Sequence, residues 1–136
     1  MVRALIAGFR RRPSPERRLL LRTALLFVAA HALSHQRDLR RTRSAVRALA
    51  RGLRAHAADA DQLAGAIDAV SRYLPGHHSC LINALCCDAI AASSGIATEL
   101  KIGAAYERVR MHFHAWVEYE GATLTGAHDG EFAALR

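Results

Sequence analysis

Cys80 and His114 are the two residues of this sequence that best suit nucleophilic catalysis. A cysteine attacks a carbonyl carbon as its thiolate, and a nearby histidine can take the thiol proton and later protonate the leaving group. Cys80 stands at the expected start of an apolar helix, where unpaired N–H groups and the helix dipole favour negative charge. His114 stands in the middle of an alternating strand pattern. We therefore interpret the pair as a nucleophile and its general base.

The other two cysteines, Cys86 and Cys87, lie one to two turns further into the same expected helix. We interpret both as small buried apolar residues, which is the usual place of a free cysteine. On a helix Cys80 and Cys87 are about 10 Å apart, farther than the roughly 7 Å that a disulfide spans. Three sparse cysteines predict reduced thiols and a cytoplasmic protein.

Three further residues share the strand face of His114: His112, Trp116 and Glu118. His112 is either part of the cleft lining or a surface residue, and Trp116 is either a core residue or a wall that keeps water from the thiol and the imidazole. Of the two readings we expect the one in which both residues bind the substrate. Glu118 is four residues from His114 along one strand, about 13 Å, which is too far to orient the imidazole directly.

A metal site is the strongest alternative to the thiol–imidazole pair. His112 and His114 form a His-x-His pattern, and His77, His78 and Cys80 could supply further ligands. Zinc requires three or four such residues to converge, and their spacing matches no compact zinc signature. We therefore expect no metal and no cofactor.

The hydrophobic pattern changes from helical to strand-like at Gly95, after which apolar residues alternate with polar ones. Helices first and an antiparallel sheet afterwards predict an α+β fold, with an apolar central helix that carries the cysteine and a small sheet that carries the histidine. The helices are expected over 14–33, 36–56, 60–74 and 80–94, and the strands over 97–102, 111–119 and 122–125.

Length and charge predict one domain over residues 1–136 with two unlike parts. Residues 1–58 hold fourteen arginines and two acids, whereas residues 59–136 hold five basic and ten acidic residues. The arginines either pack against the acidic part or meet an acidic partner. No nucleic-acid motif accompanies them, and the apolar run 19–33 is too short and too polar for stable membrane insertion.

The sequence over residues 76–121 resembles a known family, in the stretches Gly-His-His-Ser-Cys-Leu-Ile-Asn-Ala-Leu, Ser-Gly-Ile-Ala-Thr-Glu-Leu-Lys-Ile-Gly and Phe-His-Ala-Trp-Val-Glu-Tyr-Glu-Gly. It is similar to the split, transglutaminase-like leader peptidases of lasso-peptide biosynthesis. The resemblance implies a papain-like fold and a cysteine protease that cleaves the leader from a ribosomal precursor peptide. It also implies two protein partners, a small leader-binding protein and an ATP-dependent cyclase.

The chain departs from this family at one catalytic position. Many members carry an aspartate twelve residues after the histidine, where this chain has Gly126, and the nearest acid is Asp129. A three-residue hairpin loop over 119–121 would put Gly126 opposite His114, with no acid across from the base. A two-residue Glu120–Gly121 turn would put Asp129 on the His114 face. The orienting group is therefore Asp129, a backbone acceptor near 125–127, or none.

Two other activities remain open at this point. The missing acid at position 126 is compatible with a binding module that kept the fold without catalysis. Transglutaminase chemistry passes through the same thioester, although small size and the family resemblance favour hydrolysis. The arginine-rich helices are expected to dock the leader or the leader-binding protein.

Overall fold

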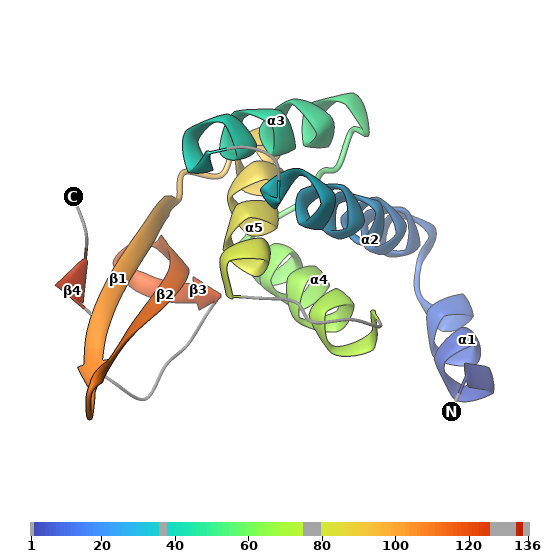
Figure 1. Cartoon of the computed structure of the whole chain (residues 1–136). Helices are drawn as coiled ribbons and strands as arrows, with labels where there is room; N and C mark the ends of the chain where they lie inside the picture. The colour runs from blue at the N-terminus through green and yellow to red at the C-terminus, as the bar shows by residue number, and fades with distance from the viewer. Residues whose placement is uncertain (1, 36–37, 75–79, 126–132, 135–136) are drawn as a thin grey trace.

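The computed structural model describes residues 2–35, 38–74, 80–125 and 133–134 (Figure 1). Within these ranges the chain forms five helices followed by four strands. The helices are α1 (Val2–Arg11), α2 (Ser14–Ser34), α3 (Leu39–Gly52), α4 (Ala60–Tyr73) and α5 (Cys80–Ser94). The strands are β1 (Glu99–Glu107), β2 (Arg110–Tyr119), β3 (Ala122–Thr125) and β4 (Ala133–Ala134).

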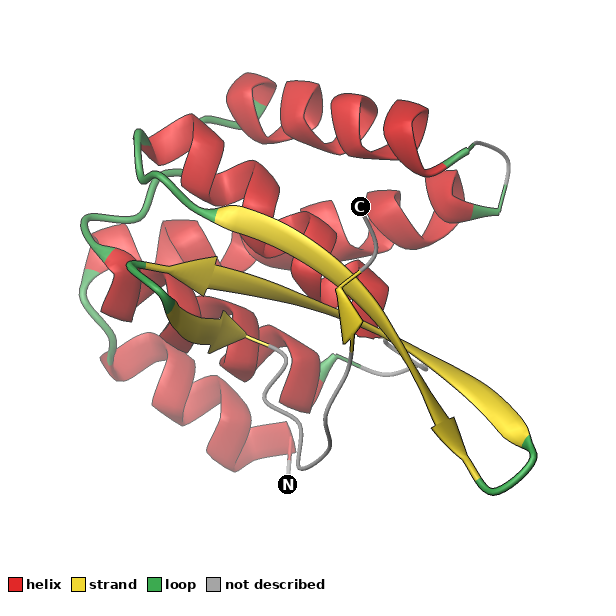
Figure 2. Ribbon diagram, turned by 90° about the vertical axis from the view of Figure 1, so that its left-hand side faces the viewer, coloured by secondary structure: helices red, strands yellow, loops and turns green. Residues whose placement is uncertain are grey.

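The predicted α+β layout is confirmed: the sheet is antiparallel, has the order β3-β2-β1-β4 and lies beside the helices (Figures 1 and 2). Its two faces differ. Ala115 and Val117 of β2, with their neighbours Ile102 and Leu100 on β1, pack into the core that the helices form. The alternate residues of β2, which include His114, therefore belong to the opposite face.

Helix α5 is the centre of the core. It contacts α2, α3 and α4 as well as β1, β2 and β3, and every residue from Ala84 to Ala91 is buried. This burial on all sides agrees with its nearly continuous apolar sequence. The helix ends at Gly95, whose φ of +74° is the left-handed conformation that the sequence predicted there.

Helix α3, in the arginine-rich part of the chain, is bound to α5 through one buried carboxylate, that of Asp88. Asp88 is fully buried and receives two hydrogen bonds from Arg43, at 2.8 and 3.0 Å, and two from Arg47, both at 2.9 Å. Burial alone would raise the pKa of Asp88, but the hydrogen bonds and charges of the two arginines outweigh it and hold the pKa below its usual value. For these two arginines, packing against the acidic part of the chain is confirmed.

The structure adds regular elements that the sequence reading left out. Helix α1 precedes the first predicted helix, and its residues between Arg3 and Arg10 are apolar or glycine. Strand β1 continues to Glu107, five residues beyond the predicted end, because every residue from 99 to 107 pairs with β2. Cross-strand pairing thus extends the strand through Gly103 and Ala104, which have little strand preference of their own.

The turn between β2 and β3 decides between the two predicted hairpins. Tyr119 pairs with Ala122, so the loop is the two-residue Glu120–Gly121 turn, and both residues have positive φ, 51° and 80°. A register shift between Val117 and Glu118 follows, so that Val117 pairs with Thr125. The sequence offered no signal for this bulge, and the pairing beyond Thr125 lies outside the described residues.

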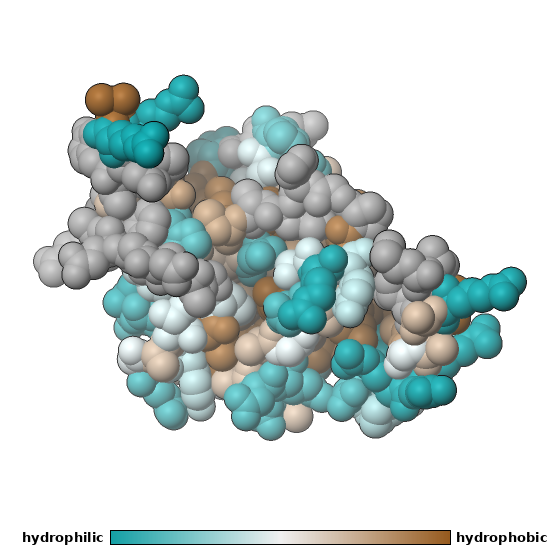
Figure 3. All heavy atoms as spheres, turned by 90° about the horizontal axis from the view of Figure 1, so that it is seen from below, coloured by the Kyte–Doolittle hydropathy of each residue, from teal (hydrophilic) through white to brown (hydrophobic). Residues whose placement is uncertain are grey.

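Part of the described surface is apolar, and Figure 3 shows hydrophobic patches between hydrophilic side chains on the face seen from below. Leu21, Leu25 and Val28 of α2 are each more than half exposed. Helix α2 is nevertheless too short or too polar to cross a membrane, as is every other described helix.

Candidate active site

Cys80 is the first residue of α5, and its thiol lies at the edge of β2. The backbone N–H of Ala115 donates a hydrogen bond to Cys80 Sγ over 3.4 Å. Cys80 is partly exposed, whereas Cys86 and Cys87 are buried. The helix start also leaves N–H groups of the first turn without intrahelical partners, which favours negative charge at this position.

His114 directly precedes the residue that binds the sulfur. Standard bond lengths and the 3.4 Å hydrogen bond put Cys80 Sγ within about 6 Å of the His114 Cα, which is within reach of an imidazole. His114 is partly exposed and pairs with Gly103 on β1, a residue without a side chain to cover the ring. The structure therefore brings the two predicted catalytic residues to one place, the edge of β2.

Trp116 packs against the imidazole from the same face of β2. The two rings stack with centroids 5.9 Å apart and planes 19° apart. Trp116 is 5% exposed, and its Nε1–H donates to Glu118 Oε1 over 3.0 Å. Glu118 in turn forms an ion pair with Lys101 at 2.9 Å. One side of the His114 ring is therefore held by a tryptophan whose own orientation is fixed.

This arrangement gives Glu118 a place that the sequence reading missed. Glu118 is too far along the strand to contact His114 directly. It acts on the imidazole indirectly, because it binds Trp116, which stacks on the His114 ring. The hydrogen bond from Trp116 and that from Lys101 lower the pKa of Glu118, so the carboxylate is the favoured form. The period-two spacing of His114, Trp116 and Glu118 was the available signal, because such residues share one strand face.

The other two thiols lie in a different environment. Cys86 and Cys87 are fully buried in the core. Burial raises the pKa of Cys87 to about 12 and raises that of Cys86 further. Both thiols are therefore protonated at neutral pH, in agreement with their interpretation as core residues.

Several predicted site residues fall where the structure gives no placement. Asp129, the predicted orienting acid, lies outside the described residues, and so do His77 and His78. The backbone of His112 is described within β2, but its side chain is not. The substrate contact of His112 and the third catalytic role of Asp129 stay predictions.

Asn83 is a polar residue near the thiol that the sequence reading did not consider. It lies three residues after Cys80, one turn along the same side of α5. Its Oδ1 is buried and has no hydrogen-bond partner among the described residues. Such an atom carries a desolvation penalty, so substrate or solvent that reached it would be bound favourably.

No metal centre forms among the residues that the structure describes, since they contain no group of three His, Cys, Asp or Glu side chains placed to hold an ion. Two of the ligands considered for the zinc alternative, His77 and His78, are not described. The described part of the site therefore offers thiol and imidazole chemistry.

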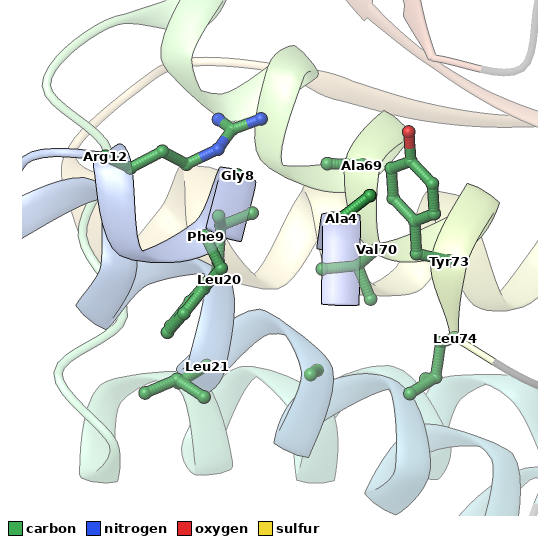
Figure 4. A pocket seen from close by; sticks show the side chains of 11 residues that line it. Ala4, Gly8, Phe9, Arg12, Leu20, Leu21, Ala69, Val70, Tyr73 and Leu74 are labelled. Atoms are coloured by element: carbon green, nitrogen blue, oxygen red, sulfur yellow. The ribbon is translucent and has the colours of Figure 1, made fainter. Parts of the chain in front are cut away.

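A cavity of the described chain lies away from this site, between α1, α2 and α4 (Figure 4). Its volume is about 540 Å³, and its walls are mainly apolar, with Phe9, Leu20 and Val70 among them. Arg12 and Tyr73 supply its polar atoms. No nucleophile or acid–base pair lines it, so we place the chemistry at Cys80 and not in this cavity.

Comparison with known proteins identifies a family for most of the chain. The family model for the transglutaminase-like superfamily matches residues 8–136. No match was found among the curated proteins or among the solved structures. The matched range contains both the helix that begins with Cys80 and the strand that carries His114.

Proposed function

Because the chain belongs to the transglutaminase-like superfamily, we propose that it is a cysteine peptidase that removes the leader from a lasso-peptide precursor. The observation that carries the proposal is the hydrogen bond from the Ala115 N–H to Cys80 Sγ. It joins a thiol at a helix start to the strand that bears a histidine.

The reaction follows from the chemistry of the two residues. His114 takes the proton of Cys80, and the thiolate attacks the carbonyl carbon of the bond to be cut. The histidine then protonates the departing amine, which leaves a thioester between Cys80 and the leader. A water molecule that gives a proton to His114 attacks this thioester and releases the leader as a carboxylic acid.

Charge that develops on the carbonyl oxygen needs hydrogen-bond donors close to Cys80. The backbone N–H groups of the first turn of α5 are the nearest candidates, because the first N–H groups of a helix have no intrahelical partner. The Cys80 N–H is the donor that we propose. A second donor is not assigned.

The orientation of His114 depends in part on groups that the structure describes. Trp116 stacks on the imidazole and so limits its rotation on one side. We propose Asp129 as the acceptor that fixes the ring nitrogen, with a backbone acceptor near 125–127 or no acceptor as the alternatives. The burial of Trp116 also keeps water from that side of the ring.

The proposed biological setting rests on the sequence resemblance. The substrate is a ribosomally made precursor peptide, a small leader-binding protein presents it, and an ATP-dependent cyclase uses the amine that cleavage frees. We also propose a cytoplasmic location, in which the three free cysteines would stay reduced.

The test is cleavage of a precursor peptide, which is to be sought among the genes that neighbour this one, followed by mass spectrometry with the leader-binding protein present. We expect the wild-type chain to release the leader with a free carboxylate and Cys80→Ala to release none. Cys87→Ala is the matched control, because it removes a thiol from the same helix, and it should cleave the peptide. Cleavage by Cys80→Ala would refute the proposal, and transfer of the leader to an added amine would indicate transglutaminase chemistry instead.

A further inference from the structure

A hollow between three helices opens onto the outer face of α2. It is the cavity of Figure 4, with walls that include Phe9 of α1, Leu20 and Ala24 of α2, and Val70 and Leu74 of α4. Its volume of about 540 Å³ lies within the roughly 300–1,000 Å³ of pockets that bind ligands. Such pockets also share its lining, which is mainly apolar with a few polar groups. The hollow is therefore large enough to take apolar groups of another molecule.

The outer face of α2 continues this apolar surface. Leu21 lines the hollow, and Leu25 and Val28 follow it at helical spacing, so the three side chains lie on one side of the helix. Their exposed fractions are 56, 58 and 59%. Single exposed apolar residues are ordinary, whereas a contiguous patch marks an interaction site. We call the hollow together with Leu25 and Val28 the α2 groove.

Helix α2 has the composition of a helix that is covered on both sides. Its inner face places Leu19, Leu26 and Phe27 in the core, and its outer face carries the leucines and the valine of the α2 groove. A helix that is apolar all round is usually buried all round. The described residues nevertheless leave the outer face more than half exposed.

The α2 groove is surrounded by positive charge. Residues 1–35 contain seven arginines and a single acid, Glu16. Arg12 lines the hollow itself, and Arg18 lies one turn before Leu21 on the exposed face of α2. The ion pair between Arg12 and Glu16 is long, 4.0 Å, and exposed, so it contributes little and leaves Arg12 able to bind another carboxylate. The charge therefore favours an acidic occupant over a basic one.

The shape of the α2 groove favours a peptide over a membrane. A helix that binds a bilayer projects its apolar face into the lipid, whereas this surface begins in a hollow that a single protruding side chain can fill. From Leu21 to Val28 the helix rises about 10 Å. That length matches the apolar anchors at i, i+4 and i+7 of a helix bound in a groove.

We propose that the α2 groove binds an acidic amphipathic helix of a partner polypeptide. One apolar side chain of that helix fills the hollow, and the next ones pack on Leu25 and Val28. Its carboxylates lie near Arg12 and Arg18. This binding site goes beyond the proposed peptidase function and does not rest on it, because no residue of the α2 groove belongs to the candidate active site.

Synthetic helical peptides test the chemistry of the occupant with the wild-type chain. One fluorescein-labelled peptide carries leucines at i, i+4 and i+7 and glutamates on its other faces. A second replaces the glutamates by lysines, and a third replaces the leucines by glutamines. Fluorescence anisotropy should show the first peptide binding at least about tenfold more tightly than either other one, with an affinity that falls as salt is added. Equal affinities, or no binding of the first peptide, would overturn the inference.

Matched variants locate the binding on the protein. Leu25→Glu puts a negative charge into the α2 groove, and Leu49→Glu makes the same change at a 39% exposed leucine of α3. Both alter the net charge equally, so only the position differs. Leu25→Glu should weaken binding of the acidic peptide about tenfold or more, and Leu49→Glu less than about threefold, because only the first charge faces the occupant. Equal weakening would contradict the inference. Val28→Glu repeats the test if Leu25→Glu does not fold.

Two further measurements address the other occupants of the α2 groove. Sedimentation with vesicles of phosphatidylglycerol and phosphatidylcholine measures membrane binding, and analytical ultracentrifugation measures dimerisation. We expect neither to depend on Leu25. Vesicle binding or a dimer that Leu25→Glu abolishes and Leu49→Glu preserves would show that a membrane or a second copy covers the groove, and would overturn the inference. A failure of precursor cleavage would refute the peptidase function alone.

Discussion

The start and the middle of the active-site helix α5 place the same residue type in opposite environments. At its start, Cys80 is partly exposed and its sulfur touches the edge of β2. Two turns later, Cys86 and Cys87 are fully buried beside Asp88, which two arginines of α3 hold. The difference shows that position along the helix, more than residue type, sets what a thiol can do.

The buried middle of α5 also determines where its exposed start lies. Asp88 binds Arg43 and Arg47 through four hydrogen bonds of 2.8–3.0 Å. These bonds hold α5 against α3, so that α5 neither turns about its axis nor slides along it. A rigid helix transmits this position to Cys80, two turns away. The comparison therefore predicts that changes at the start of α5 affect activity and changes at its middle affect stability.

The largest effect is expected from His114→Gln, which keeps a polar side chain but removes the general base. The value of kcat/KM for precursor cleavage should fall about 10²- to 10⁴-fold, because general acid–base catalysis contributes about that much. The melting temperature should stay close to that of the wild type, since His114 is partly exposed. Cleavage at the wild-type rate would show that another group activates Cys80.

Asp88→Asn should have the largest effect on stability. Breaking a buried ion pair costs about 3–5 kcal/mol, and here two arginines lose their partner. Urea denaturation measures the loss. Asp68→Asn is the matched control, because its ion pair with Arg72 has the same 2.8 Å distance on the surface, where such a pair contributes about 0–1 kcal/mol. Equal losses in the two variants would contradict the role given to Asp88.

The same carboxylate gives stability a defined pH dependence. The pKa of Asp88 is lower in the folded chain than the ordinary 3.8, so folding favours its charged form. Its contribution is therefore complete above about pH 3.8 and is lost as the pH falls through the lower folded-state pKa. Urea denaturation at a series of acidic pH values should show this loss in the wild type and a smaller one in Asp88→Asn. Parallel pH profiles would exclude the linkage.

The smallest effect is expected from substitutions of Trp116 and Glu118, which limit the rotation of the His114 imidazole. Trp116→Phe keeps the stacked ring but removes the N–H that binds Glu118, and Glu118→Ala removes the acceptor. Each should lower kcat by about three- to tenfold, the equivalent of one hydrogen bond, with KM little changed. The double variant should be no worse than either single one, because both break the same contact. Additive losses would mean that the two residues act separately.

The sequence indicated the elements that carry the candidate site more clearly than the contacts that join them. Cys80 and its helix were recognisable from the apolar run that ends at Gly95, and the strand of His114 from its alternation. The contact between the thiol and Ala115 joins residues 35 positions apart and depends on how α5 packs on the sheet. No local pattern contains that information.

Three features show where local patterns were insufficient. The partners of Asp88 lie 41 and 45 residues away, so a buried acid within an apolar helix had no visible counterpart. The bulge at Val117 carries no sequence signal, although it shifts the register that bears on Asp129. The role of Glu118 was missed because only a direct contact with His114 was considered.

The most direct test of the central comparison is the alkylation rate of each thiol by iodoacetamide near neutral pH, followed by peptide mass spectrometry. We predict that Cys80 is modified first and alone in the folded protein, and that His114→Gln slows this reaction. Cys86 and Cys87 should react only after denaturation, because burial keeps them protonated and out of reach. Equal rates at all three thiols, or an unreactive Cys80, would contradict the assignment of Cys80 as the nucleophile.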